Sequence, residues 1–427
     1  MISRPDYLNQ LISWKDKNDF IKIISGVRRC GKSTLFQLFQ DHLKKGGVSD
    51  TQIININLER AEFSELMDWK KLHDHVKSTV LPDKMNYVFL DEVQMVPEFQ
   101  KAINSLRLEK NIDLYLTGSN AYMYSQKLST LLSGRYIEIK MFPLSFKEFV
   151  SAFNPSKFLT PILFDIFREY GGFPDIAKLI DIEYQEKDIA PGAKILDSVR
   201  VKTSEIQIYL DSLYNTIVAK DISLRTGIDN VSEINRIVKF LFSNVSHPTS
   251  FNNIANVVNS EFKFFPTDKN VYVSKVQKIV DALLESFLFY KCDQQQLKGK
   301  ELLRADSKYY GVDSGLRYYM LGGNKTIDGG HVLENIVYLE LLRRGNRVYT
   351  GRVRDKEVDF VTEKGDNTMY YQVALSVDSE ETLKRELASL EKIEDNFEKT
   401  ILTLGVIPQK SYRGIKIINV VDWLLGE

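Results

Sequence analysis

The chain has 427 residues, of which 43% are hydrophobic and 27% are charged, and its formal net charge is zero. This length is too great for one ordinary domain, and the composition is that of a folded globular protein. The zero net charge excludes a global field that would favour nucleic acid or anionic membranes.

The cysteines and the apolar runs indicate where the protein works. Cys30 and Cys292 lie too far apart in sequence to suggest a disulfide framework or a metal spacing, which fits a reducing compartment. The first twenty residues lack the apolar stretch and cleavage site of a signal peptide, and no apolar run is long enough to cross a bilayer. We therefore expect a cytoplasmic protein with no membrane partner.

The first third of the chain alternates between short apolar runs and helical patterns. Strands are predicted at 20–25, 52–58, 86–91, 112–118 and 136–142, and helices near 32–45, 64–80, 98–109 and 120–133. Runs such as YVFL indicate strands buried on both faces, as in a parallel sheet. The alternation predicts a doubly wound α/β fold.

The pattern changes after residue 153, where FNPSKFLTP carries two prolines. The chain is then predicted to be mostly helical to about 245, with one long helix or a helix pair over 198–228. Two short helices followed by a strand pair suggest a winged helix near 249–294. Helices and strands alternate again from about 330, which indicates a second α/β or α+β domain.

The segment GVRRCGKST has the spacing of a phosphate loop (Walker A) between a predicted strand and a predicted helix. Its glycines permit backbone conformations that turn amide N–H groups towards an anion at a helix N-terminus. Lys32 would contact the β- and γ-phosphates of ATP, Ser33 would ligate Mg²⁺, and Thr34 would support the α/β side. The predicted nucleotide-binding residues are Gly26, Val27, Arg28, Arg29, Cys30, Gly31, Lys32, Ser33 and Thr34.

Arg28 and Arg29 stand where small residues would bend more easily. They would either touch phosphate or pair with acids on a lid or a neighbouring subunit. We favour ion pairs, because Lys32 and the backbone amides already serve the phosphates.

The segment YVFLDEVQ ends a predicted buried strand in two acids (Walker B). Asp91 would hold Mg²⁺ through water, and Glu92 would act as the general base for the attacking water. Two acids at a strand end are otherwise a solvated turn, and the phosphate loop favours the catalytic interpretation.

Two further segments supply candidate catalytic residues. In LTGSN, Asn120 would form a hydrogen bond to the γ-phosphate or to the attacking water, and Ser119 is the second choice for this role. A helix N-cap explains either residue equally well. In LLSGRY, Arg135 would reach the γ-phosphate of its own site or of a neighbouring subunit, or would form a structural ion pair.

These pieces in this order resemble an AAA+ ATPase, and more closely the archaeal and bacterial family with a C-terminal domain of unknown function related to restriction endonucleases. The matching segments are GVRRCGKST, FLDEVQ, LTGSN, LLSGRY, FPLSFKEF, YGGFPD, KYYGVDSGLR, LENIVYLELLRRG, KEVDFVT and YYQVA. The resemblance implies a P-loop core, a helical lid, a winged helix and a nuclease-like α/β domain. The expected boundaries are 1–153, 154–228, 229–325 and 326–427.

In the nuclease-like domain, Glu334 and Asp359 stand at places that the resemblance gives to carboxylates that hold Mg²⁺. The last strand should supply an acid and a lysine, but Gln372 and Ala374 stand there. Glu357 remains as a substitute ligand on the same strand face as Asp359. We therefore expect a domain that binds rather than cuts.

The expected function is hydrolysis of ATP to reposition the winged helix and the C-terminal domain. DNA or RNA is the favoured partner, and the chain is a candidate homo-oligomer. The alternatives are a slow nucleotide switch that assembles with a protein partner and an ATP-gated nuclease. Basic side chains that would contact phosphates are Arg343, Arg344, Arg347, Arg352, Arg354 and Lys356 on a predicted hairpin, and Lys275 and Lys278 on a winged-helix segment. A solvated hairpin is the favoured explanation of the first set.

Overall fold

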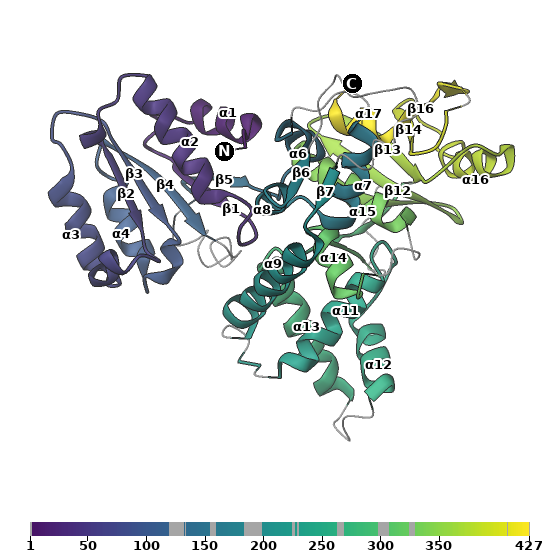
Figure 1. The fold of residues 1–427 in the computed structure, drawn as a ribbon, viewed down its shortest axis with the longest axis horizontal. Coiled ribbons are helices and arrows are strands. Elements are labelled where there is room, and N and C mark those ends of the chain that lie inside the picture. The colour runs from purple at the N-terminus through teal and green to yellow at the C-terminus, as the bar shows by residue number, and fades with distance from the viewer. Residues whose placement is uncertain are drawn as a thin grey trace. The chain divides into compact units, whose positions relative to one another are not determined.

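A computed structural model describes residues 2–118, 132, 134–153, 159–182, 199–223, 227–228, 230–262, 269–297, 307–323, 329–407 and 409–426. The chain divides into two compact units (Figure 1). The first comprises Met1–Phe142 with Glu285–Phe287, and the second Pro143–Leu284 with Leu288–Glu427. Within the described ranges, no helix is long and apolar enough to span a membrane. The division into four domains remains a prediction.

The first unit is built on a five-stranded parallel sheet with the order β2-β3-β4-β1-β5. Its strands are β1 (Ile21–Ser25), β2 (Ile53–Asn57), β3 (Asn86–Asp91), β4 (Ile112–Gly118) and β5 (Tyr136–Lys140). The five strands and the α/β class predicted from the sequence are confirmed. In this order β4 separates β1 from β3, so the carboxyl ends of these three strands lie side by side.

Helices cover both faces of this sheet (Figure 1). They are α1 (Pro5–Ser13), α2 (Lys32–Lys45), α3 (Trp69–Thr79) and α4 (Phe99–Leu106). Val88 and Leu90 of β3 belong to a core that includes residues of α3 and α4. Phe89, between them, has its ring centroid 5.0 Å from that of Phe36 on α2. Successive residues of β3 therefore serve opposite helical layers, which explains the unbroken apolar run.

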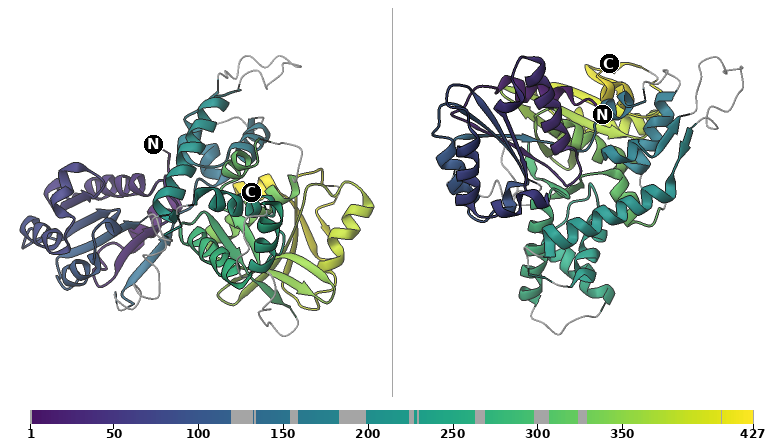
Figure 2. Two further views of the ribbon diagram at one scale, coloured as in Figure 1. Left: turned by 90° about the horizontal axis from the view of Figure 1, so that it is seen from below. Right: turned by 60° about the vertical axis from the view of Figure 1, so that its left-hand side comes forward.

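The second unit contains a seven-stranded mixed sheet with the order β15-β16-β14-β13-β12-β11-β9 (Figure 2). Its strands are β9 (Gln294–Gln296), β11 (Arg347–Val353), β12 (Lys356–Lys364), β13 (Asn367–Ala374), β14 (Glu398–Thr403), β15 (Ser411–Tyr412) and β16 (Ile415–Asn419). Helices α15 (Gly329–Arg343), α16 (Glu380–Leu390) and α17 (Val420–Leu425) accompany it. The predicted return of α/β alternation after residue 330 is confirmed.

The rest of this unit is largely helical. It contains α6 (Phe146–Ser151), α7 (Thr160–Tyr170), α8 (Pro174–Ala177), α9 (Thr203–Thr216), α11 (Val231–Ser243), α12 (Phe251–Phe262), α13 (Lys269–Glu285) and α14 (Ser314–Met320), with β8 (Phe289–Cys292) antiparallel to β10 (Lys308–Gly311). The prediction of helix throughout 198–228 is wrong at its start. Val199–Val201 form β7, antiparallel to β6 (Ile180–Ile182), because their β-branched residues suit a strand with a partner.

Asp313 joins two segments of the second unit. Its carboxylate caps α14 by accepting the N–H groups of Gly315 and Leu316, and it also accepts that of Gly172 at 2.7 Å. Gly171 ends α7 with φ of 85°, and a Cβ there would lie 2.0 Å from Asp313. The Gly-Gly break after α7 is therefore a docking point for this carboxylate.

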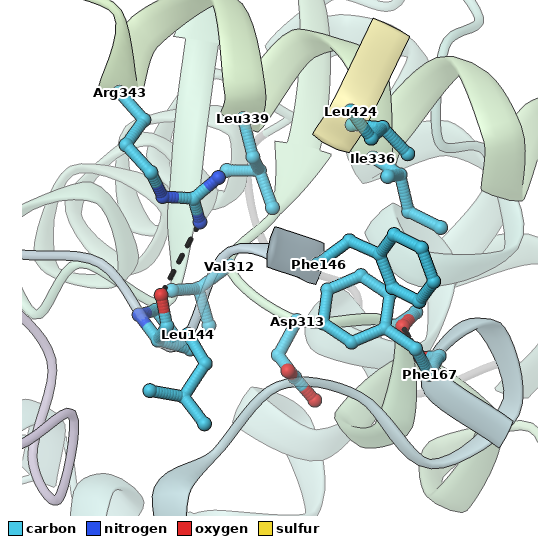
Figure 3. Close-up of a pocket in the computed structure, with 11 residues that line it drawn as sticks. Leu144, Phe146, Phe167, Val312, Asp313, Ile336, Leu339, Arg343 and Leu424 are labelled. Atoms are coloured by element: carbon cyan, nitrogen blue, oxygen red, sulfur yellow. Dashed lines mark hydrogen bonds between the residues drawn. The ribbon is translucent and has the colours of Figure 1, made fainter. Parts of the chain in front are cut away.

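A cavity of about 20 Å³ lies beside Asp313, lined by Phe146, Phe167, Leu339 and Arg343 among others (Figure 3). The guanidinium of Arg343 donates to the carbonyl oxygen of Pro143 at 3.2 Å. A space of this size holds about one water molecule, so it is not a substrate pocket.

Candidate functional site

The predicted phosphate loop joins β1 to α2 at the carboxyl edge of the first sheet. Gly26 has φ of 148°, and a Cβ there would lie 2.1 Å from the carbonyl oxygen of Met141, beyond β5. Gly31 has φ of 107° and forms the N-cap of α2. Only glycine fits the first position without movement of the backbone, so the loop is packed directly against the segment that ends the first unit.

Lys32, the first residue of α2, is buried. Its Nζ donates to the carbonyl oxygens of Gly26 at 2.9 Å and Val27 at 3.1 Å. The ammonium thus lies over the loop whose backbone would surround an anion. Ser33 and Thr34 follow on the first turn of α2 and are exposed.

The large loop residues have separate roles. A guanidinium nitrogen of Arg28 lies 3.5 Å from the carboxylate of Glu59, which follows β2. An acid of the same unit thus pairs with Arg28, where an acid on the lid or a neighbouring subunit was predicted. Arg29 is exposed and has φ of 61°, a conformation that costs a non-glycine residue energy. Cys30 is fully buried, and burial raises the pKa of its thiol, which disfavours the reactive thiolate.

Asp91 is the last residue of β3 and Glu92 directly follows it, and both are buried. The carboxylate of Asp91 accepts hydrogen bonds from the Thr117 hydroxyl and from the amide of Asn57, the latter at 3.0 Å. Glu92 has φ of 56°, and its backbone N–H donates to the Thr117 hydroxyl at 2.9 Å. The side-chain amide of Gln94 donates to the Glu92 carboxylate.

Thr117 was not among the predicted site residues, although it stands in the LTGSN segment. It is fully buried on β4, paired in register with Ile24 of β1. Neighbouring strands lie about 4.8 Å apart, so this register places Thr117 between the phosphate loop and the two acids. Its single hydroxyl, which donates to Asp91 and accepts from Glu92, fixes both acids relative to the loop.

The structure describes one of the other two predicted catalytic residues, Arg135, and it does not join this group. Asn120 and its alternative Ser119 lie outside the described residues. Arg135 is exposed and directly precedes β5, whose first residue Tyr136 pairs with Ile21 at the start of β1. The phosphate loop follows the other end of β1, about 16 Å away for five residues of parallel strand. This placement argues against contact between Arg135 and the phosphates of its own site.

Arg4 is a second residue that the sequence did not indicate. It is almost fully buried, immediately before α1. Its guanidinium donates to the carbonyl oxygens of Cys30, at 3.0 Å, and Phe142, at 2.8 Å. The Tyr7 hydroxyl accepts from the N–H of Phe142 at 3.2 Å, and the Arg4 guanidinium lies over the Tyr7 ring. The amino-terminal segment thus ties the phosphate loop to the end of the first unit.

In the second unit, several predicted basic contacts serve internal structure. Arg343 and Arg344 both pair with Glu340, and Arg344 lies over the ring of Trp423. Lys275 on α13 pairs with the buried Glu233 of α11. Arg347, Arg352, Arg354 and Lys356 are exposed on the β11–β12 hairpin, where Arg354 lies 3.2 Å from Glu394.

The predicted acids of the second unit come together, but around a lysine. Nζ of Lys308 on β10 lies 3.2 Å from Oε1 of Glu334 on α15 and 2.6 Å from Oε1 of Glu357 on β12. Asp359 is buried two residues after Glu357, and its carboxylate accepts the N–H of Val373 at 2.8 Å. Gln372 instead bonds Glu386 and Ser389 of α16.

Comparison with known proteins gives two family matches and close relatives. Residues 18–150 match an AAA domain, and residues 197–326 match a domain of unknown function (DUF8612). An uncharacterized protein of Haemophilus influenzae is 38% identical over 428 residues, covering 100% of this chain and 99% of the relative. The uncharacterized protein MJ1544 of Methanocaldococcus jannaschii is 29% identical over 423 residues, covering 94% and 85%.

Among solved structures, the Aeropyrum pernix ORC1 protein in complex with DNA aligns with 12% identity and a TM-score of 0.33. The alignment covers 75% of this chain and 92% of that chain. A likeness at this level says nothing about what the present chain binds.

Proposed function

We propose that this protein, which belongs to the AAA+ ATPase family, binds ATP with Mg²⁺ and hydrolyses ATP to ADP and phosphate. The observation that carries the proposal is the hydrogen-bonded set of Asp91, Thr117 and Glu92, one strand away from a phosphate loop with a buried lysine. A pair of acids at a strand end would be unremarkable in isolation. Here the register of β1, β4 and β3 supports their use on the bound nucleotide.

The residues of the site fit both ligands. Gly26 lies close to Met141, and the backbone of the loop that it begins would surround the phosphate oxygens. The ammonium of Lys32 would exchange its carbonyl partners for the β- and γ-phosphates. Ser33 and Asp91 would hold Mg²⁺, which supplies positive charge against the phosphates when bound. Glu92 would take the proton of the attacking water, with Thr117 keeping the two acids in their places.

Arg135 is proposed to act on a neighbouring subunit. It is exposed at the amino end of β5, whereas its own phosphate loop follows the carboxyl end of the neighbouring strand β1. An arginine so placed would be free to stabilise negative charge at the site of another copy of the chain. The proposal therefore includes a homo-oligomer.

The proposed output is movement of parts of the second unit that act on nucleic acid. Helices α11, α12 and α13 followed by the pair β8 and β10 suit a winged helix, and the exposed arginines of the β11–β12 hairpin suit phosphate contacts. The pairing of Lys275 with Glu233 favours the alternative, a slow switch whose partner is a protein, because it commits a helix cation to internal structure.

Steady-state phosphate release from purified protein, with and without DNA or RNA, tests this function. Lys32→Ala should abolish ATP binding, since the ammonium is the point charge that the loop provides. Lys45→Ala, an exposed lysine at the far end of the same helix, is the matched control. Turnover that increases with nucleic acid supports the first proposal, and slow turnover insensitive to it favours the switch.

A further inference from the structure

The second unit contains a buried cation surrounded by acids. Lys308 has 3% of its side chain exposed, and its ammonium contacts Glu334 and Glu357, which come from α15 and β12. The Tyr310 hydroxyl donates to the same Glu334 oxygen at 2.7 Å. Asp359 interacts electrostatically with both Lys308 and Glu334. Acids from two elements, α15 and β12, thus gather around one positive charge on a third element, β10.

Carboxylates that converge in this manner are the ligands that Mg²⁺ and Mn²⁺ prefer, and the sequence analysis expected Glu334 and Asp359 in that role. The geometry does not fit a metal. Oε1 of Glu334 already accepts hydrogen bonds from the Lys308 ammonium and the Tyr310 hydroxyl. In the described part of the chain, no group of three or more histidine, cysteine or acidic side chains is arranged to hold a metal ion.

Strand β13, which would complete a metal site, directs the side chain of Gln372 towards α16 instead. The Gln372 amide donates to Glu386 at 3.3 Å and accepts from the Ser389 hydroxyl at 3.2 Å, both on α16. The cluster formed by Glu334, Glu357 and Asp359 therefore has no further ligand from β13, whereas it does have a cation of its own.

We propose that the ammonium of Lys308 occupies the place of a divalent metal in this acidic cluster, so that the second unit binds no divalent cation there and does not cleave phosphodiester bonds. The three N–H donors of a lysine satisfy carboxylate oxygens without the two positive charges that activate a water. A nuclease-like cluster is thus kept as a structural ion group, and removal of the ammonium exposes a latent metal site.

The test is calorimetric titration of the nucleotide-free full chain with Mn²⁺. Wild-type protein and the Asp359→Asn variant should bind Mn²⁺ equally, because the wild-type cluster holds no metal. Lys308→Met should gain Mn²⁺ affinity on the order of tenfold or more, because a positive charge leaves the centre of the cluster. Adding Asp359→Asn to Lys308→Met should abolish the gain, and Lys356→Met, at the exposed lysine next to Glu357 on β12, should show none.

Two results would overturn the proposal. One is Mn²⁺ binding or Mn²⁺-dependent DNA cleavage by wild-type protein that Asp359→Asn abolishes. The other is a folded Lys308 variant that gains no Mn²⁺ affinity. Lys308→Gln, which keeps hydrogen-bond donors without the charge, replaces the methionine variant if that one does not fold, and the wild-type titration is decisive in either case.

Discussion

The guanidinium of Arg4 donates a hydrogen bond to the carbonyl oxygen of Cys30 inside the phosphate loop, 26 residues further along the chain. A second bond, to Phe142, ties the same group to the end of the first unit. The two bonds hold the phosphate loop to Phe142, the last residue of the first unit before Pro143. The arrangement gives a residue outside every sequence motif a positioning role.

Arg4→Gln should weaken ATP binding and lower the free energy of unfolding. The change removes the guanidinium from two buried charge-assisted bonds, each worth about 1.5–3 kcal/mol. Calorimetry and urea unfolding measure the two effects. The control is Arg60→Gln. The guanidinium of Arg60 is exposed and pairs with Glu62. Wild-type ATP affinity in Arg4→Gln would remove the proposed link between this residue and the loop.

Thr117→Val should reduce turnover more than ATP affinity. Valine keeps the shape of the side chain but cannot bond Asp91 or the N–H of Glu92, so the two acids lose their common partner. One lost hydrogen bond to a charged group corresponds to on the order of tenfold in rate. Thr117→Ser retains the hydroxyl and should retain most activity. Equal kcat in wild type and Thr117→Val, by phosphate release, would show that the shared hydroxyl is only structural.

Arg135→Ala and Lys32→Ala should each abolish hydrolysis alone and partly restore it when mixed. Each subunit then supplies the residue that the other lacks, because Arg135 lies at the amino ends of the strands and Lys32 beyond their carboxyl ends. Phosphate release from the mixture, with assembly verified by light scattering, is the measurement. Assembled but inactive mixtures would argue against action across a subunit boundary.

Asp313 should make stability depend on pH. Burial raises the pKa of its carboxyl to about 6 from the ordinary 3.8, although three backbone N–H groups favour the charged form. A raised folded-state pKa contributes stability that is complete below the unfolded value and is lost as pH rises through about 6. Asp313→Asn removes this titration. The stability advantage of wild type over the variant should therefore fall by about 2 kcal/mol between pH 4.5 and pH 7.

Urea unfolding at several pH values measures this difference. Asp366→Asn, at an exposed position of the β12–β13 turn, is the matched control. An advantage of wild type that grows with pH would contradict the assignment, since it would mean that the charged form of Asp313 is the one that the fold favours.

The strands of the first unit could be predicted because buried parallel strands leave unbroken apolar runs, as YVFL does between two helical layers. The loop glycines and the two acids at the end of β3 could be proposed as site residues because the chemistry of a nucleotide site requires fixed spacing. Thr117 was missed because its role depends on strand order: only the position of β4 between β1 and β3 brings it to both acids. Its residue type and local sequence carry no such information.

Lys308 was missed for a related reason. It stands in KYYGVDSGLR, a segment recognised only as part of a resemblance, and its partners lie 26 and 49 residues further on. Nothing local marks a lysine on a short strand as buried among acids. The first helix was also not predicted, although its buried residues Tyr7 and Leu11 stand four apart, as on one face of a helix. Arg4 owes its role to that helix.

The most direct test of the account is single-site replacement of Glu92 by glutamine, measured by ATP binding and steady-state phosphate release. Glutamine keeps the size of the side chain and removes the base, so Glu92→Gln should bind ATP and hydrolyse it at least about a hundredfold more slowly. Glu98→Gln is a close control, because Glu98 has φ of 55° against 56° for Glu92 but is exposed before α4. Loss of turnover in Glu92→Gln alone is the predicted result. Wild-type turnover in that variant would contradict the assignment of Glu92 as the base.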